Sequence, residues 1–67
     1  MEKEIIGPGA KFREILTSMK VGEESRFSIP ARRSVWSTIS NLKLDGKGEW
    51  SSTLRKNEGF LLVVRRK

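Results

Sequence analysis

The residues best suited to chemistry form a short row in the stretch "GEWSSTLRKNEGFLLVVRRK". Ser51, Thr53 and Arg55 alternate there, so in a β-strand their side chains project from the same face. Hydroxyl and guanidinium groups hydrogen-bond phosphate oxygens and base edges. The row therefore predicts a surface that binds nucleic acid. Its alternative interpretation is an ordinary strand facing solvent.

A second basic group opens a predicted helix, where Arg32 and Arg33 precede Ser34. Cations near a helix N-terminus are slightly unfavourable for the helix dipole. Two arginines at this place indicate another purpose, such as holding phosphate together with free backbone N–H groups. The alternative is that they only solvate an exposed turn. The other candidate contacts for nucleic acid are Arg26, Lys56, Arg65 and Arg66.

Charge is distributed unevenly along the 67 residues, whose formal net charge is +6. Residues 1–24 carry four cations against five anions, whereas residues 25–67 carry ten cations against three anions. A localised positive field is typical of proteins that bind nucleic acid. A small sheet can also lie in a major groove. We therefore expect a nucleic-acid partner, with duplex DNA favoured over RNA.

Catalysis has little support in the sequence. The chain has no histidine and no cysteine, which removes the commonest general base and the thiolate metal ligand. Asp45 and Glu49 are best explained as residues of a solvated loop. "GPG" at 7–9 and "DGKGEW" at 45–50 lack the context and spacing of a phosphate-binding loop. We expect no enzymatic activity, no small-molecule substrate, no cofactor and no metal.

Two apolar stripes at helical spacing predict the helices of the fold. The first stripe predicts an amphipathic helix over about residues 10–19, and the second predicts a helix over 31–43. The residues of the first stripe are Phe12, Ile15, Leu16 and Met19. Those of the second are Ala31, Val35, Ile39 and Leu42.

The predicted strands are residues 25–29, 49–55 and 60–65, and "KNEG" at 56–59 closes the final hairpin. The last strand is apolar on both faces, as is typical of a central strand. We predict an α+β domain, a β-α-β-β unit with a three-stranded antiparallel sheet of order 1-3-2 packed on one helix. A short amphipathic helix precedes this unit. We expect one domain over residues 1–67, with an N-terminal arm at 1–9 and a folded core at 10–67. Within the first segment, the apolar pair Ile5 and Ile6 is either a short strand or part of the arm.

The two faces of the last strand leave one question open. We place Phe60, Leu62 and Val64 under the helix at 31–43, which leaves Leu61 and Val63 on the face of the polar row. Either the N-terminal helix or a partner covers those two residues. A partner would make the chain a protein-interaction module, an inhibitor or adaptor, or a homodimer joined through this apolar face.

Trp36 and Trp50 also allow two interpretations. They could stack on unpaired bases, as aromatic residues do in proteins that bind single strands. In so short a chain, however, tryptophan more often forms the largest part of the core.

The sequence also indicates a compartment. Its longest apolar run, residues 60–64, is far shorter than the roughly 20 residues that span a membrane. We also expect that the first residues do not form a secretory signal. Together with the absence of cysteine, this predicts a protein of the reducing cytoplasm, associated with the nucleoid if it binds DNA.

The segments "MKVGEESRFSIPARRSVWSTISN" and "GKGEWSSTLRKNEGFLLVVRR" resemble small uncharacterised basic proteins of phages and mobile elements. Those proteins share a "KVGES-F-hydrophobic-P" opening, a helix rich in Ser and Arg, and a "GK-aromatic-ST-R-K" ending. The resemblance covers about residues 19–66. It implies a small accessory or regulatory protein that binds nucleic acid, and it implies no catalytic residues.

Overall fold

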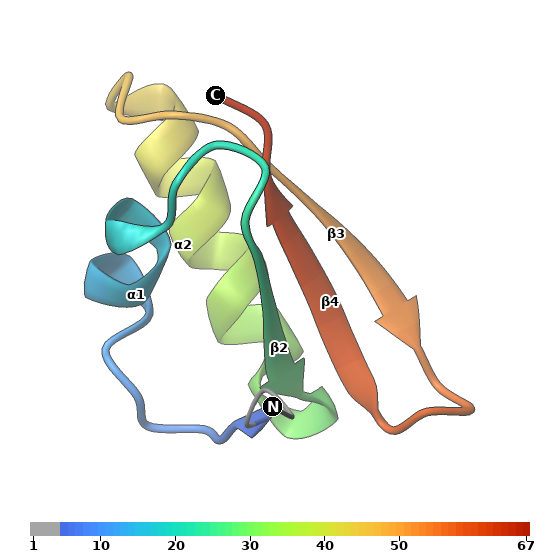
Figure 1. The fold of residues 1–67 in the computed structure, drawn as a ribbon. Coiled ribbons are helices and arrows are strands. Elements are labelled where there is room, and N and C mark those ends of the chain that lie inside the picture. Colours follow the sequence, from blue (N-terminus) through green and yellow to red (C-terminus); the bar gives the residue numbers. More distant parts are fainter. Residues whose placement is uncertain (1–4) are drawn as a thin grey trace.

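The computed structural model describes residues 5–67, which form two α-helices and four strands (Figure 1). In chain order the elements are β1 (Ile5–Ile6), α1 (Phe12–Ser18), β2 (Glu24–Ser28), a 3-10 turn (Ile29–Ala31), α2 (Arg32–Leu44), β3 (Trp50–Arg55) and β4 (Phe60–Arg65). The predicted α+β class is confirmed. No helix in this described range is long and apolar enough to cross a membrane.

The sheet is mixed and has four strands in the order β1-β2-β4-β3. The prediction of a purely antiparallel three-stranded sheet is wrong, because Ile5 and Ile6 add β1 parallel to β2. The other three strands do pair antiparallel in the predicted 1-3-2 order, with β4 in the centre. Part of the predicted N-terminal arm is therefore a sheet edge, while its residues 1–4 lie outside the described range.

Both helices lie on the same side of the sheet (Figure 1). Ser28 is extended and ends β2, and Ile29, predicted as the last residue of this strand, instead begins the 3-10 turn. Pro30 lies within this turn, where its fixed φ suits the path into α2. Helix α1 has only seven residues, and so short a helix is not stable in water by itself. Its stability must come from the apolar stripe that it packs against α2 and the sheet.

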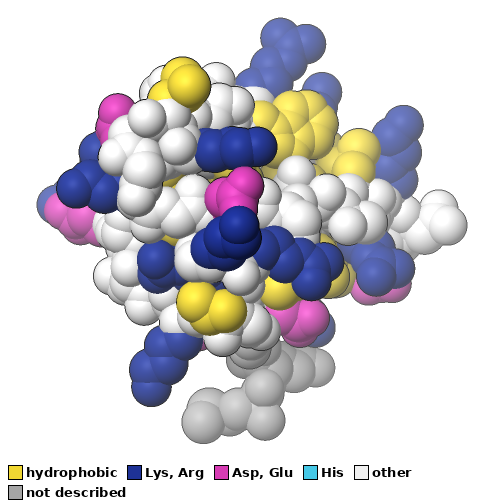
Figure 2. All heavy atoms as spheres, turned by 90° about the horizontal axis from the view of Figure 1, so that it is seen from above, with side chains coloured by type: hydrophobic (Ala, Val, Ile, Leu, Met, Phe, Trp, Pro, Cys, Tyr) yellow, Lys and Arg dark blue, Asp and Glu magenta, His cyan; other side chains and the backbone are white. Residues whose placement is uncertain are grey.

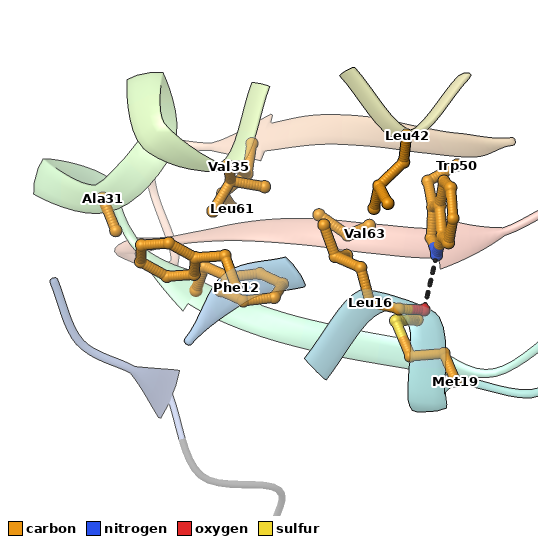
Figure 3. Packing of buried hydrophobic residues seen from close by; sticks show 10 residues of the cluster. Phe12, Leu16, Met19, Ala31, Val35, Leu42, Trp50, Leu61 and Val63 are labelled. Atoms are coloured by element: carbon orange, nitrogen blue, oxygen red, sulfur yellow. Dashed lines mark hydrogen bonds between the residues drawn. The ribbon is translucent and has the colours of Figure 1, made fainter. Parts of the chain in front are cut away.

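The core fills the space between the two helices and the sheet (Figure 3). Its fully buried large side chains are Leu16 of α1, Phe27 of β2, Val35 and Leu42 of α2, and Leu61 and Val63 of β4. The ring of Phe12 lies 5.7 Å from that of Phe27 between their centroids. Every layer thus contributes to one apolar cluster, as the two helical stripes predicted.

The helices cover the opposite face of β4 from the one predicted. Leu61 and Val63 are 0% exposed, and they lie in the core with Val35. The reason is the register, because Phe27 of β2 lies beside Leu61 and therefore shares its face. The placement of Phe60, Leu62 and Val64 under α2 is wrong. The question of what covers Leu61 and Val63 is answered by α1 and α2 themselves.

Candidate nucleic-acid interface

The face of the sheet that points away from both helices, here called the open face, carries most of the predicted site. Alternation along β2, β3 and β4, together with their register, assigns its members. They are Glu24, Arg26, Ser28, Ser51, Thr53, Arg55, Phe60, Leu62 and Val64, with Arg66 directly beyond β4. Among residues 5–67 no helix covers this face (Figure 1).

The predicted row lies on the open face and gains two arginines from other strands. Thr53 of β3 and Arg26 of β2 both lie beside Leu62, one on each side of the central strand. At the other end of the row, Arg66 donates from Nε to the hydroxyl of Ser51 at 3.0 Å. The sheet therefore places Arg26 and Arg66 on the same face as the polar row, although Arg26 is distant from that row in sequence.

The middle of the open face is apolar rather than polar. Leu62 and Val64 are half-buried, and Phe60 is only 7% exposed. The guanidinium carbon of Arg26 lies 4.9 Å from the centroid of the Phe60 ring. This cation–π contact holds the charge of Arg26 against the strand, because the face of the ring attracts a cation. The open face thus presents a narrow apolar strip bordered by arginine and hydroxyl groups.

Neither tryptophan lies on the open face. Trp50 is in the core, which confirms the core interpretation and excludes its stacking on bases in this conformation. Trp36 is 40% exposed on α2 and donates from Nε1 to the hydroxyl of Ser52 at 2.9 Å. Ser52 belongs to the side of β3 that faces the helices. The open face therefore has no exposed aromatic ring among its described members.

Arg65 lies on the helix side of the sheet, not with the polar row. Its guanidinium donates to the carbonyl oxygens of Thr17 (3.2 Å) and Met19 at the end of α1. It also lies 5.1 Å from the Trp50 ring, whose Nε1 donates to Leu16 at 3.1 Å. These donors satisfy the last carbonyls of α1, which would otherwise lack partners. Arg65 also donates to the carbonyl oxygens of Lys47 and Lys67.

Neighbouring arginines therefore have different roles, and their replacement should separate them. Arg65→Gln is expected to lower the free energy of unfolding by about 1.5–3 kcal/mol, because several charged hydrogen bonds are lost. Arg66 lies on the open face, and Arg66→Gln should change the free energy of unfolding by less than about 0.5 kcal/mol. Urea unfolding followed by tryptophan fluorescence measures both values. Equal losses for the two variants would contradict these assignments.

The basic start of α2 lies at the end of the sheet where β2 ends and β4 begins (Figure 1). Arg32 is half-buried and donates from Nη1 to the carbonyl of Ile29 at 3.0 Å. Arg33 is exposed in the first turn. Lys56, in the loop between β3 and β4, is exposed at this same end of the sheet. These cations flank the open face instead of lying on it.

Several of the other cations are paired with carboxylates. Lys67 lies 3.2 Å from Glu49, and Lys43 lies 3.7 Å from the same carboxylate. The hydrogen bond and the charge of Lys67 lower the pKa of Glu49 below its ordinary value. Arg13 pairs with Asp45 at 3.1 Å. The view from above shows Lys and Arg side chains on several sides of the molecule (Figure 2), so the position of the open face cannot be inferred from net charge alone.

Among the residues that the structure describes, no group of three or more acidic side chains could hold a metal ion. Comparisons with protein-family models, with curated proteins and with solved structures gave no match to this chain.

Proposed function

We propose that the protein binds nucleic acid through the open face, with duplex DNA favoured over RNA. The observation that carries the proposal is the composition of an uncovered sheet face. Arg26, Arg55 and Arg66 border it together with hydroxyl groups, and Glu24 is the one carboxylate among the open-face residues named above. The strands hold the backbone of these residues in place, so no segment of the chain has to become ordered when they bind.

The shape of the open face favours duplex over single-stranded partners. Sheets enter the major groove, which is about 12 Å wide and presents distinct base edges. Proteins that bind single strands use exposed rings on which bases stack, and here Phe60 is 7% exposed. The aliphatic side chains of Leu62 and Val64 could instead contact thymine methyl groups.

The arginines and hydroxyls would divide the contacts by position. Arg26 and Arg55 lie on either side of the apolar strip and would reach base edges or the nearest phosphates. Arg33, Lys56 and Arg66 lie at the margins and would contact phosphate without regard to sequence, as would the donors of Arg32 that do not bind Ile29. Arg65 is left out, since its guanidinium is occupied within the fold. A regulatory or accessory role in a phage or mobile element fits this activity.

A binding titration against salt concentration tests the proposal. A duplex of about 20 base pairs should bind, and the logarithm of its association constant should fall steeply with the logarithm of salt. With about five phosphate contacts the slope is expected to be near −4 to −5. A single strand and an RNA duplex of the same sequence should bind more weakly. No binding of any of the three at ~50 mM salt would refute the proposal.

The apolar strip favours one alternative, a protein-interaction module. Leu62 and Val64 are only half-buried on a face that neither helix covers. A protein partner would bind this strip in a way that is nearly insensitive to salt, because apolar contact is not screened. The salt dependence of binding therefore distinguishes the two functions.

A further inference from the structure

Strand β3 forms an open edge of the sheet. It pairs with β4 on one side, and among residues 5–67 no strand lies beyond it (Figure 1). Edge strands expose unpaired N–H and C=O groups, and proteins usually protect them with proline, lysine, a bulge or a covering segment. The strand reads WSSTLR, with no proline and no lysine, and six of its residues pair with β4 in unbroken register. The opposite edge, β1, has only two residues.

The outward backbone groups of β3 can be identified from the bonds at its start. Glu49 uses its N–H and its C=O on the β4 side, where they bond to Lys67 and Arg66. Arg65, the partner of Trp50, uses its own groups on the other side, toward Gly22 and Glu23. Since these directions alternate along a strand, the outward groups belong to Trp50, Ser52 and Leu54. They lie at every second residue, as an added antiparallel strand requires.

This edge is complementary to a second copy of itself. Antiparallel pairing about a two-fold axis at Ser52 places Ser52 opposite Ser52 of the partner subunit, and Trp50 opposite Leu54 of the partner subunit. Each of these pairs exchanges two N–H···O=C bonds. The same register places Arg55 opposite Glu49 of the partner subunit, so that opposite charges meet at both ends. Shifting the axis to Thr53 would lose this charge pair.

Trp36 adds an apolar contact at the same axis. Its indole donates to the hydroxyl of Ser52 and is 40% exposed in the single chain. A two-fold axis at Ser52 brings the Trp36 side chains of both copies close to the axis, on the helix side of the sheet. Burial of aromatic rings at a symmetric contact stabilises association. A second copy of the chain would thus cover both the exposed indole and the unprotected edge.

We propose that the chain forms a homodimer by antiparallel pairing of its β3 strands about Ser52. The two sheets then become one continuous sheet, with all helices on one side and both open faces on the other. The proposal concerns the edge of the sheet and does not require that the open face bind nucleic acid.

Sedimentation velocity between about 5 and 500 µM tests the association, because a dimer of micromolar affinity dissociates within that range. The mass should rise from 7.7 kDa for one chain toward twice that value. Ser52→Pro removes an outward N–H without removing a bond to β4, and it should weaken the dimer at least about tenfold. The control Ser52→Ala keeps the N–H but loses the hydrogen bond to Trp36. Its dimer dissociation constant should stay within about threefold of that of the parent chain. A parent chain that stays monomeric, or a dimer unaffected by Ser52→Pro, overturns the proposal.

Disulfide formation tests the register without a disruptive substitution, since the chain contains no cysteine. Ser52→Cys should form a disulfide-linked dimer on mild oxidation, because Cα atoms at the axis would lie about 5.5 Å apart. In the single variants Ser51→Cys and Thr53→Cys, the new cysteine lies opposite Thr53 or Ser51 of the partner subunit and not opposite a second cysteine. Each of these variants should therefore form the disulfide at least about tenfold more slowly. Equal rates for the three variants overturn the register. Duplex binding by the Ser52→Pro monomer is measured separately, so failure of the dimer and failure of nucleic-acid binding give different results.

Discussion

Replacing Arg26, Arg55 and Arg66 together by glutamine is expected to weaken binding to duplex DNA by about 100-fold or more at ~100 mM salt. These arginines lie on three different strands or their extensions, yet the register brings them to one face. Glutamine keeps most of the side-chain length and removes the charge. The salt dependence should also become shallower, by about one unit of slope for each arginine that contacts phosphate.

A matched control removes the same amount of charge elsewhere. Lys11, Lys20 and Lys47 are exposed and lie before α1, after α1 and after α2, outside the sheet. Their replacement by glutamine changes the net charge by the same three units. Because a distant charge is screened beyond about 10 Å at 0.1 M salt, this variant should lose less than about fivefold in affinity. Fluorescence anisotropy with a labelled duplex measures both variants, and similar losses would mean that net charge, not the open face, governs binding.

The helices and the polar row could be predicted because each depends on a local pattern. Ala31, Val35 and Leu42 repeat at helical spacing, and all three are buried in the core. Ser51, Thr53 and Arg55 alternate in a strand and lie on one face of it. In such segments a single face is apolar or polar, and the period alone shows which residues lie together.

The period could not decide which face of β4 is buried, because both faces are apolar. The hairpin contained the missing information. A loop of four residues places Arg55 opposite Phe60, so Leu54 lies opposite Leu61 and the polar row lies opposite Phe60, Leu62 and Val64. The loop length therefore implied that the polar row and Leu62 share a face. The same register places the two apolar residues of β3, Trp50 and Leu54, on the face of Leu61 and Val63, and this would have predicted the correct core.

Two other features depend on long-range contacts that no local pattern reveals. Strand β1 has two residues, which is too short for alternation to be recognised, and it exists because β2 offers a free edge. Alternation places Arg65 and Arg66 on opposite faces of the sheet, but it does not show that the Arg65 guanidinium reaches the end of α1. Its role at the end of α1 follows from the position of Trp50 across the hairpin.

The buried face of β4 leads to the second large expected effect. Leu61→Ala should lower the free energy of unfolding by about 2–5 kcal/mol, because it removes a fully buried side chain and leaves a cavity among both helices and the sheet. A domain of this size has a total stability of roughly 3–10 kcal/mol. We therefore expect the variant to lose a large part of its stability and its Tm to fall by about 10 °C or more, as followed by circular dichroism during thermal unfolding.

Leu62→Ala is the matched control, since it removes the same atoms from the next residue of the same strand. Leu62 is half-buried on the open face, where no helix packs against it, so the loss should be about 1 kcal/mol or less. If Leu62→Ala were the more damaging of the two, the helices would cover the face of Phe60, Leu62 and Val64, and the polar row would lie beside Leu61 and Val63. Should both variants lose several kcal/mol, a partner or a second copy would cover the open face as well, and the open face would not be free to bind duplex DNA.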